Sequence, residues 1–100
     1  MIGFLQGRPM ISEGEALLIL VQGVGYEVHC SQNTRDDFEG KDFVEAWVYT
    51  HMREDALTLF GFATVVERQV FVSLLKVNGI GPKSALKILS AAPLQTLLQM

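Results

Sequence analysis

The hydrophobic pattern of the chain changes near Ala63, and this change constrains the fold more than any other feature. Before Ala63, apolar residues form short runs or alternate with polar ones, which is typical of β-strands. After Ala63 they recur every three or four positions, as on one face of a helix. We therefore expect an α+β protein with two parts, residues 1–62 and residues 63–100.

Short strands are expected throughout the first part. Their ranges are 2–8, 15–22, 25–30, 43–52 and 56–62. The run 15–22 is almost continuously apolar, which predicts a strand buried on both faces, and Gly23 and Gly25 favour a tight hairpin after it. The polar stretch 33–42 is expected to be a connection.

Closely spaced short strands favour a small closed barrel, because closure removes exposed strand edges. An antiparallel OB-type barrel fits this spacing best, and an SH3-like barrel fits almost as well.

Helices are expected after Ala63. Thr64 and Glu67 form the pattern of a capping box, in which the hydroxyl accepts from an early helical N–H and the carboxylate reaches back. The apolar positions of this helix, which should end near Val77, are Val66, Val70, Leu74 and Leu75. A second helix should begin at Pro82, and Ala85, Leu86, Ile88 and Leu89 form its packing face. A third is expected over 94–100.

The turn between the first two helices has the features of an anion site. Gly79 and Gly81 allow positive φ angles and close approach of a ligand to the backbone, while Ile80 can turn inward. Pro82 then begins a helix whose first N–H groups are free and whose dipole attracts anions. The residues expected to bind a phosphate backbone are Lys76, Asn78, Gly79, Ile80, Gly81, Lys83, Ser84 and Lys87. The alternative is a simple connecting loop with solvated lysines.

The charge distribution agrees with an anionic ligand for the second part alone. Residues 1–62 hold four basic against ten acidic side chains, a net −6, whereas residues 63–100 hold four basic side chains against Glu67, a net +3. Only the second part can therefore attract a polyanion such as DNA.

Several motifs occur together in a recognisable order. The glycine turn matches a helix-hairpin-helix motif, hydrophobic-x-Gly-hydrophobic-Gly-x-x-x-Ala, from Val77 to Ala85. The other matching segments are MIGFLQG at 1–7, GVGYEV at 23–28, TH at 50–51, REDA at 53–56 and LFGF at 59–62. Together they resemble the N-terminal half of the RuvA family, the bacterial subunits that recognise Holliday junctions.

The resemblance implies a function and an assembly. It implies an OB domain at 1–62 that forms a homotetramer, and structure-selective, sequence-independent binding of four-way DNA in recombination, DNA repair and the SOS response. Glu54 and Asp55 match the family's acidic pin at the junction centre, although a solvated turn is the plain reading of the pair. The implied partners are a RuvB-type motor and a RuvC-type resolvase. The subunit is implied to be cytoplasmic and non-catalytic.

The chain also departs from the family pattern. A second helix-hairpin-helix and the domain that contacts the motor do not occur before Met100, which suggests a fragment or a short form. We therefore expect weak binding by a lone subunit and no coupling to the motor.

Other functions are less compatible with the sequence. A glycosylase-lyase fragment needs a carboxylate after the hairpin, and no Asp or Glu follows Glu67. An oligomerising barrel whose helices bind a protein remains an alternative. We expect no metal or cofactor, because His29 and His51 lack ligand spacing, and we expect Cys30 to be a buried thiol. Packing in the core or between subunits is expected of the aromatic residues Tyr26, Phe43, Trp47 and Tyr49. The longest apolar run, 16–21, is too short to span a membrane.

Overall fold

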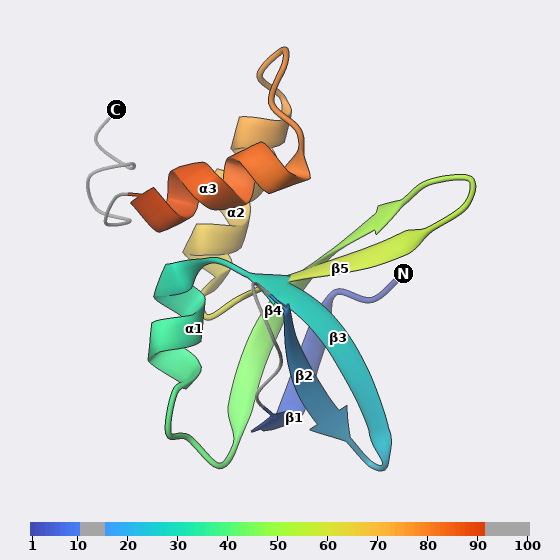
Figure 1. The fold of residues 1–100 in the computed structure, drawn as a ribbon, viewed down its shortest axis with the longest axis vertical. Helices are drawn as coiled ribbons and strands as arrows, with labels where there is room; N and C mark the ends of the chain where they lie inside the picture. Colours follow the sequence, from blue (N-terminus) through green and yellow to red (C-terminus); the bar gives the residue numbers. More distant parts are fainter. Residues whose placement is uncertain (11–15, 92–100) are drawn as a thin grey trace.

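A five-stranded barrel carries three helices on one side, as the computed structural model of the chain shows (Figure 1). The structure describes residues 1–10 and 16–91, so the helix expected over 94–100 lies outside the described residues. The strands are β1 Phe4–Met10, β2 Ala16–Val21, β3 Val24–Cys30, β4 Val44–Met52 and β5 Leu57–Phe62. The helices are α1 Gln32–Phe38, α2 Val65–Leu75 and α3 Pro82–Ala91. None of the described helices is long and apolar enough to cross a membrane.

The barrel closes in the order β1-β2-β3-β5-β4. β1 joins the two ends of the sheet, because its first half pairs with β4 (Leu5 opposite Ala46) and its second half pairs with β2 (Pro9 opposite Ile19). β3 and β5 run parallel, and every other neighbouring pair is antiparallel. The OB-type barrel is therefore confirmed, with one parallel pair in an otherwise antiparallel sheet.

The β2–β3 hairpin is as tight as the glycines predict. Val21 pairs with Val24, and the two residues between them, Gln22 and Gly23, both have positive φ angles of 48° and 87°. This is the geometry of a type I′ turn, which matches the twist of the strands. The expectation that β2 is buried on both faces was wrong. Only alternate residues such as Ile19 are fully buried, because the outer face of the barrel remains partly open to solvent.

The helix α1 is the main departure from the sequence expectation, which treated 33–42 as a connection. Ser31 caps the helix, and its hydroxyl accepts a hydrogen bond from the N–H of Thr34 at 3.2 Å. Phe38, near the end of α1, is buried in the barrel core. The sequence of this helix, QNTRDDF, has no apolar period, because Phe38 is its one apolar side chain.

Two apolar cores hold the molecule together. The first fills the barrel, and the second joins the barrel to α2 and α3. Phe71 of α2 lies at the centre of the second core, with its ring 4.8 Å from that of Phe62 and 5.2 Å from that of Phe60. Three of the four residues expected on the packing face of α3, Ala85, Leu86 and Leu89, are buried, and the fourth, Ile88, is half-buried.

The expected capping box at the start of α2 was only half right. The hydroxyl of Thr64 does accept a hydrogen bond from the N–H of Glu67, at 3.1 Å. The carboxylate of Glu67 does not reach back to Thr64, because it accepts hydrogen bonds from the hydroxyls of Ser31 and Thr34 instead. Glu67 therefore connects α2 to α1.

Candidate nucleic-acid interface

The turn between α2 and α3 depends on Gly79. Its φ angle is +89°, a conformation that side chains with a Cβ rarely adopt. The turn closes with a hydrogen bond from the N–H of Ile80 to the carbonyl of Val77 at 3.1 Å. Ile80 is half-buried and packs against the second core, so its side chain turns inward as expected. This anchor leaves the rest of the turn facing solvent.

Gly81 differs from Gly79 because the fold itself does not require it. Its φ angle is not positive, and a Cβ built there would meet nothing within 4 Å. Its carbonyl accepts the first hydrogen bond of α3, from the N–H of Ala85 at 2.9 Å. Gly81 therefore lies just before the helix and leaves the approach to the first helical N–H groups open.

Three lysines lie on the helices that flank the glycine turn. Lys76 lies at the end of α2, and Lys83 and Lys87 lie on the first two turns of α3. All three lysines are exposed, as are the expected ligands Asn78 and Ser84. Among the described residues, the close contacts between basic and acidic side chains are Lys41–Asp37 and His29–Glu27, and neither involves these three lysines. Their charges are thus available to an external anion.

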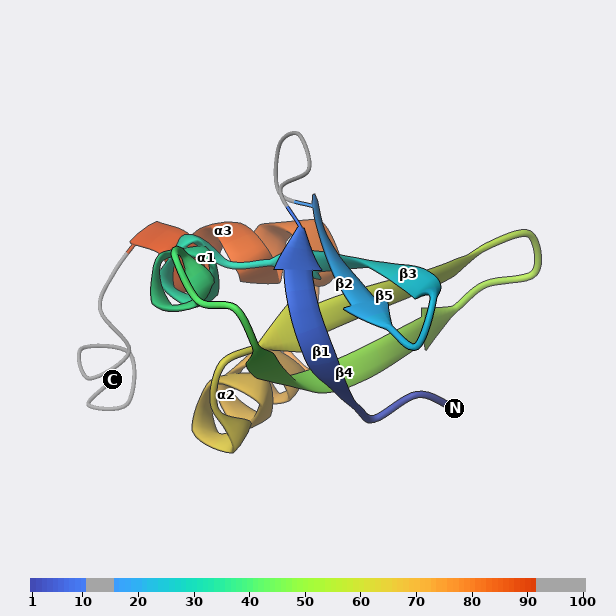
Figure 2. The same cartoon turned by 90° about the horizontal axis from the view of Figure 1, so that it is seen from below.

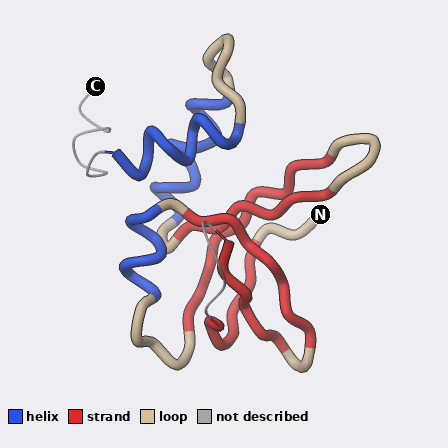
Figure 3. The backbone as a smooth tube through the Cα atoms, in the orientation of Figure 1, coloured by secondary structure: helices blue, strands red, loops and turns tan. Residues whose placement is uncertain are grey.

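The second predicted site lies at the tip of the β4–β5 hairpin. Met52 pairs with Leu57, and the N–H of Arg53 donates to the carbonyl of Ala56 at 2.8 Å to close the turn. Glu54 and Asp55 occupy the tip and are exposed. Figure 3 shows this tip and the α2–α3 turn as loops that project from the body of the molecule.

The hairpin and the glycine turn border one cleft of about 440 Å³. Arg53 and Ala56 line it from the hairpin, and the segment from Gly81 to Ser84 lines it from the start of α3. The two predicted sites are therefore neighbours, although Glu54 and Asp55 lie beside the lining rather than in it.

Sequence reasoning missed three residues of this cleft. Arg53 adds a further positive charge, and His29 and His51 face the same space from β3 and β4. Both histidine rings lie near the ring of Phe60, with centroid-to-centroid distances of 5.7 Å for His29 and 6.4 Å for His51. Nε2 of His51 is buried and has no hydrogen-bond partner among the described residues. The only local signal was the position of Arg53 next to the acidic pair.

Cys30 is a structural thiol rather than part of this surface. Its side chain is buried in the barrel core, and its thiol donates a long hydrogen bond of 3.7 Å to the carbonyl of Val28. Burial raises the pKa of this thiol to about 12, which the nearby Arg35 only partly offsets. A thiol with such a pKa is unreactive at neutral pH.

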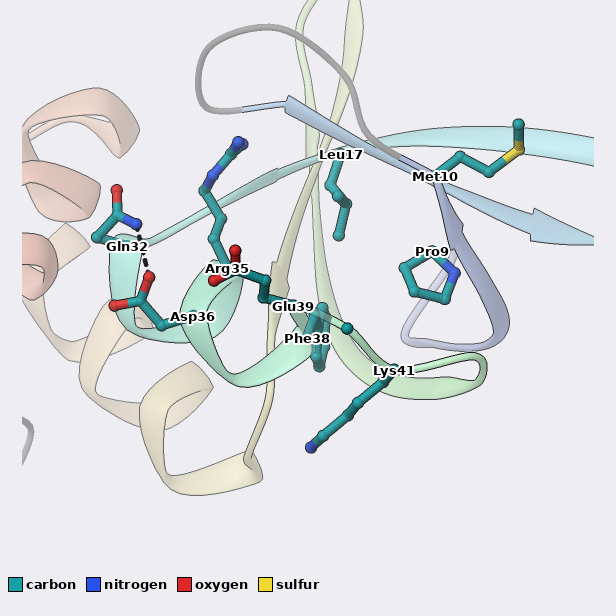
Figure 4. Close-up of a pocket in the computed structure, with 10 residues that line it drawn as sticks. Pro9, Met10, Leu17, Gln32, Arg35, Asp36, Phe38, Glu39 and Lys41 are labelled. Carbon is teal, nitrogen blue, oxygen red and sulfur yellow. Dashed lines mark hydrogen bonds between the residues drawn. The ribbon is translucent and has the colours of Figure 1, made fainter.

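A second hollow, of about 410 Å³, lies between α1 and the ends of β1 and β2 (Figure 4). Its lining combines the apolar side chains of Leu17 and Phe38 with charges of both signs, including Arg35 and Glu39. It contains none of the residues predicted to bind DNA. Its mixed charge gives it no preference for an anion.

Comparison with known proteins identifies similar chains. The family model described as the RuvA N terminal domain matches residues 1–61. A protein of Bdellovibrio bacteriovorus is 53% identical over 93 residues, which cover 90% of this chain and 47% of that protein. A protein of Syntrophobacter fumaroxidans is 45% identical over 91 residues, covering 90% of this chain and 46% of its own length. One from Amoebophilus asiaticus is 41% identical over 102 residues, covering 99% and 52%.

All three of these relatives bear the name Holliday junction branch migration complex subunit RuvA. The chain spans about half the length of the curated relatives it matches.

Proposed function

Because the chain belongs to the RuvA N-terminal domain family, we propose that it binds four-way (Holliday) junction DNA through the phosphate backbone, without reading base sequence. Its relatives are named as subunits of a branch migration complex, which supports a role in recombination and repair. We propose further that the subunit binds DNA without catalysing a reaction and that it works in the cytoplasm. Residues 1–62 would form one functional part and residues 63–100 the other.

One observation carries the proposal: the space around Gly81. A residue with neither a positive φ angle nor a close neighbour has no folding reason to be glycine. A phosphate group approaching the N–H groups of Lys83 and Ser84 supplies a reason, because a side chain at position 81 would stand in its path. Lys83 adds a full charge beside those N–H groups, and such contacts grip DNA of any sequence.

Glu54 and Asp55 are proposed to act as a pin. Carboxylates repel phosphates, so a pair of them on a projecting hairpin disfavours uninterrupted duplex and tolerates the gap where strands cross. The pin therefore supplies selectivity against linear DNA, whereas the glycine turn supplies affinity.

A homotetramer completes the proposed site. A single glycine turn neutralises about one or two phosphates, which gives weak binding with a shallow salt dependence. Several copies joined through their barrels bind the arms of one junction together, and the effective concentration then raises the affinity. A RuvB-type motor and a RuvC-type resolvase are the protein partners that we propose for full-length members of the family.

The test is a titration of the chain with a synthetic four-way junction and with linear duplex of the same length and composition. We expect a preference for the junction of about tenfold or more. Sedimentation with and without the junction measures the assembly, and a tetramer is expected. Equal affinity for the two DNAs contradicts the proposed selectivity, and the absence of binding to either DNA favours the alternative, a barrel whose helices bind a protein.

A further inference from the structure

The helix α1 lies where the barrel, α2 and α3 meet (Figures 1 and 2). It contains none of the residues predicted to contact DNA. Yet polar groups in its cap and first turn make hydrogen bonds to both helices of the glycine-turn unit. These bonds connect α1 to α2 and to α3, the two helices that the glycine turn joins.

Toward α2, the contacts centre on the carboxylate of Glu67, which is only 4% exposed. Its Oε1 accepts hydrogen bonds from the hydroxyls of Ser31 and Thr34, the latter at 2.7 Å. The hydroxyl oxygen of Thr34 also accepts from the N–H of Ala63 at 3.0 Å. Because hydrogen bonds to a carboxylate are strong and directional, they fix the start of α2 relative to α1.

Toward α3, two hydrogen bonds hold the end of the helix that is remote from the glycine turn. Nδ2 of Asn33 donates to the carbonyl of Leu89 at 2.9 Å. The N–H of Gln32 donates to the hydroxyl of Ser90, also at 2.9 Å. Ser90 lies roughly 13 Å along the helix from Gly81, given the rise of an α-helix. Because α3 is a rigid helix, contacts at its C-terminal end help to set the position of the glycine turn at its N-terminal end.

Apolar packing alone does not set this direction as firmly. The ring contacts of Phe71 with Phe60 and Phe62 hold the helices against the barrel, but hydrophobic burial is largely non-directional. The pin belongs to the barrel and the glycine turn belongs to α3, so their relative position depends on whatever fixes α3 to the barrel.

We propose that α1 is a positioning clamp that fixes the glycine turn relative to the Glu54–Asp55 pin and thereby sets the preference for four-way over linear DNA. The inference rests on the proposed function. Such a clamp affects selectivity because phosphate binding by the glycine turn alone does not distinguish a duplex from a junction. With the pin held at a fixed distance from the glycine turn, the repulsion by its carboxylates favours the junction.

The test releases α3 from α1 without disturbing the buried carboxylate, whose removal endangers folding. The variant Asn33→Ala/Ser90→Ala loses both contacts at the remote end of α3. Its matched control is Gln32→Ala, which removes only the exposed bond from the Gln32 side chain to Asp36 (Figure 4) and keeps the Gln32 N–H bonded to Ser90.

We expect the junction preference of the double variant to fall about threefold to tenfold, with duplex affinity changed less than about twofold, since two modest hydrogen bonds are lost. The control should match the parent. An unchanged preference overturns the proposal. An equal fall in affinity for both DNAs also overturns it, because that result reports general destabilisation.

A second readout needs no DNA. Spin labels at Met52→Cys on the hairpin and Val77→Cys beside the turn report the distance between the two loops, and both positions are exposed. We expect a broader distance distribution in the double variant than in the parent or the control; equal widths overturn the clamp. If the parent shows no junction preference, the proposed function fails, while these distances still decide whether α1 is a clamp.

Discussion

Gly79 and Gly81 lie two positions apart in one turn, but only Gly79 has a positive φ angle, +89°. A Cβ at either position would meet nothing within 4 Å, so neither glycine avoids an internal clash. The backbone conformation therefore accounts for Gly79, whereas the fold gives no reason for a glycine at position 81, and the proposed function supplies one in a bound phosphate. Under the proposed function, Gly79 is therefore needed for folding and Gly81 for binding DNA.

Substitution of each glycine by alanine is expected to give opposite results. Gly79→Ala should lower the free energy of unfolding by about 1 kcal/mol, because alanine is strained at a positive φ angle. Gly81→Ala should change it by less than about 0.5 kcal/mol but weaken DNA binding about threefold to tenfold. Urea denaturation measures the stability, and a junction titration measures the affinity. Full affinity in a stable Gly81→Ala protein contradicts the role of this residue in binding.

The salt dependence of binding tests the role of Lys83. Loss of one phosphate contact lowers the slope of log affinity against log salt concentration by about 1, whatever the base sequence. We expect this change for Lys83→Ala in titrations over a series of salt concentrations. Lys41→Ala is the control. Lys41 follows α1, and its Nζ lies 3.2 Å from Oδ2 of Asp37, so its substitution should leave the slope unchanged. A slope equal to that of the parent in Lys83→Ala shows that this lysine contacts no phosphate.

The sequence was sufficient to predict those elements that depend on residues close together in the chain. Strand alternation and the glycine turn follow from periods and backbone preferences within a few residues, so the barrel and the inward side chain of Ile80 could be predicted. The helix α1 could not be predicted, because its contacts are distant in sequence; the hydroxyl of Thr34, for example, donates to Glu67, which lies 33 positions later.

The same physical reason explains the residues missed in the cleft. His29 lies on β3 and Arg53 in the β4–β5 turn. They share a cleft with Lys83 only because β3 pairs with β5 and α3 packs against the barrel. Glu67 shows how distant contacts can also override a local pattern. The sequence predicts that its carboxylate bonds to Thr64, but in the structure it accepts from the hydroxyls of Ser31 and Thr34.

Neutralising the pin should relax selectivity. In Glu54→Gln/Asp55→Asn the repulsion of phosphates is gone, so affinity for linear duplex should rise about threefold or more while junction affinity changes little. Competition between labelled junction and unlabelled duplex measures the ratio. Asp36→Asn/Glu39→Gln removes the same charge from exposed positions in α1 and at its C-terminal cap, and so controls for net charge. An equal rise in duplex affinity in this control shows that overall charge, rather than the pin, is responsible.

The buried thiol of Cys30 should make the protein less stable at alkaline pH. Burial raises the pKa of this thiol from 9.0 to about 12 in the folded state. The unfolded chain loses the proton above about pH 9 while the folded chain keeps it, so the unfolded state binds fewer protons. The free energy of unfolding should therefore fall as pH rises between those two values, by at most about 1.4 kcal/mol per pH unit.

Urea denaturation at about pH 8 and about pH 10 measures this fall, and Cys30→Ala, which has no thiol to ionise, isolates it from other titrating groups. The variant should be less stable than the parent at the lower pH, because it leaves a small cavity, and the difference should shrink at the higher pH. A difference in stability that does not change with pH contradicts the raised pKa, since it means that the thiol ionises equally in both states.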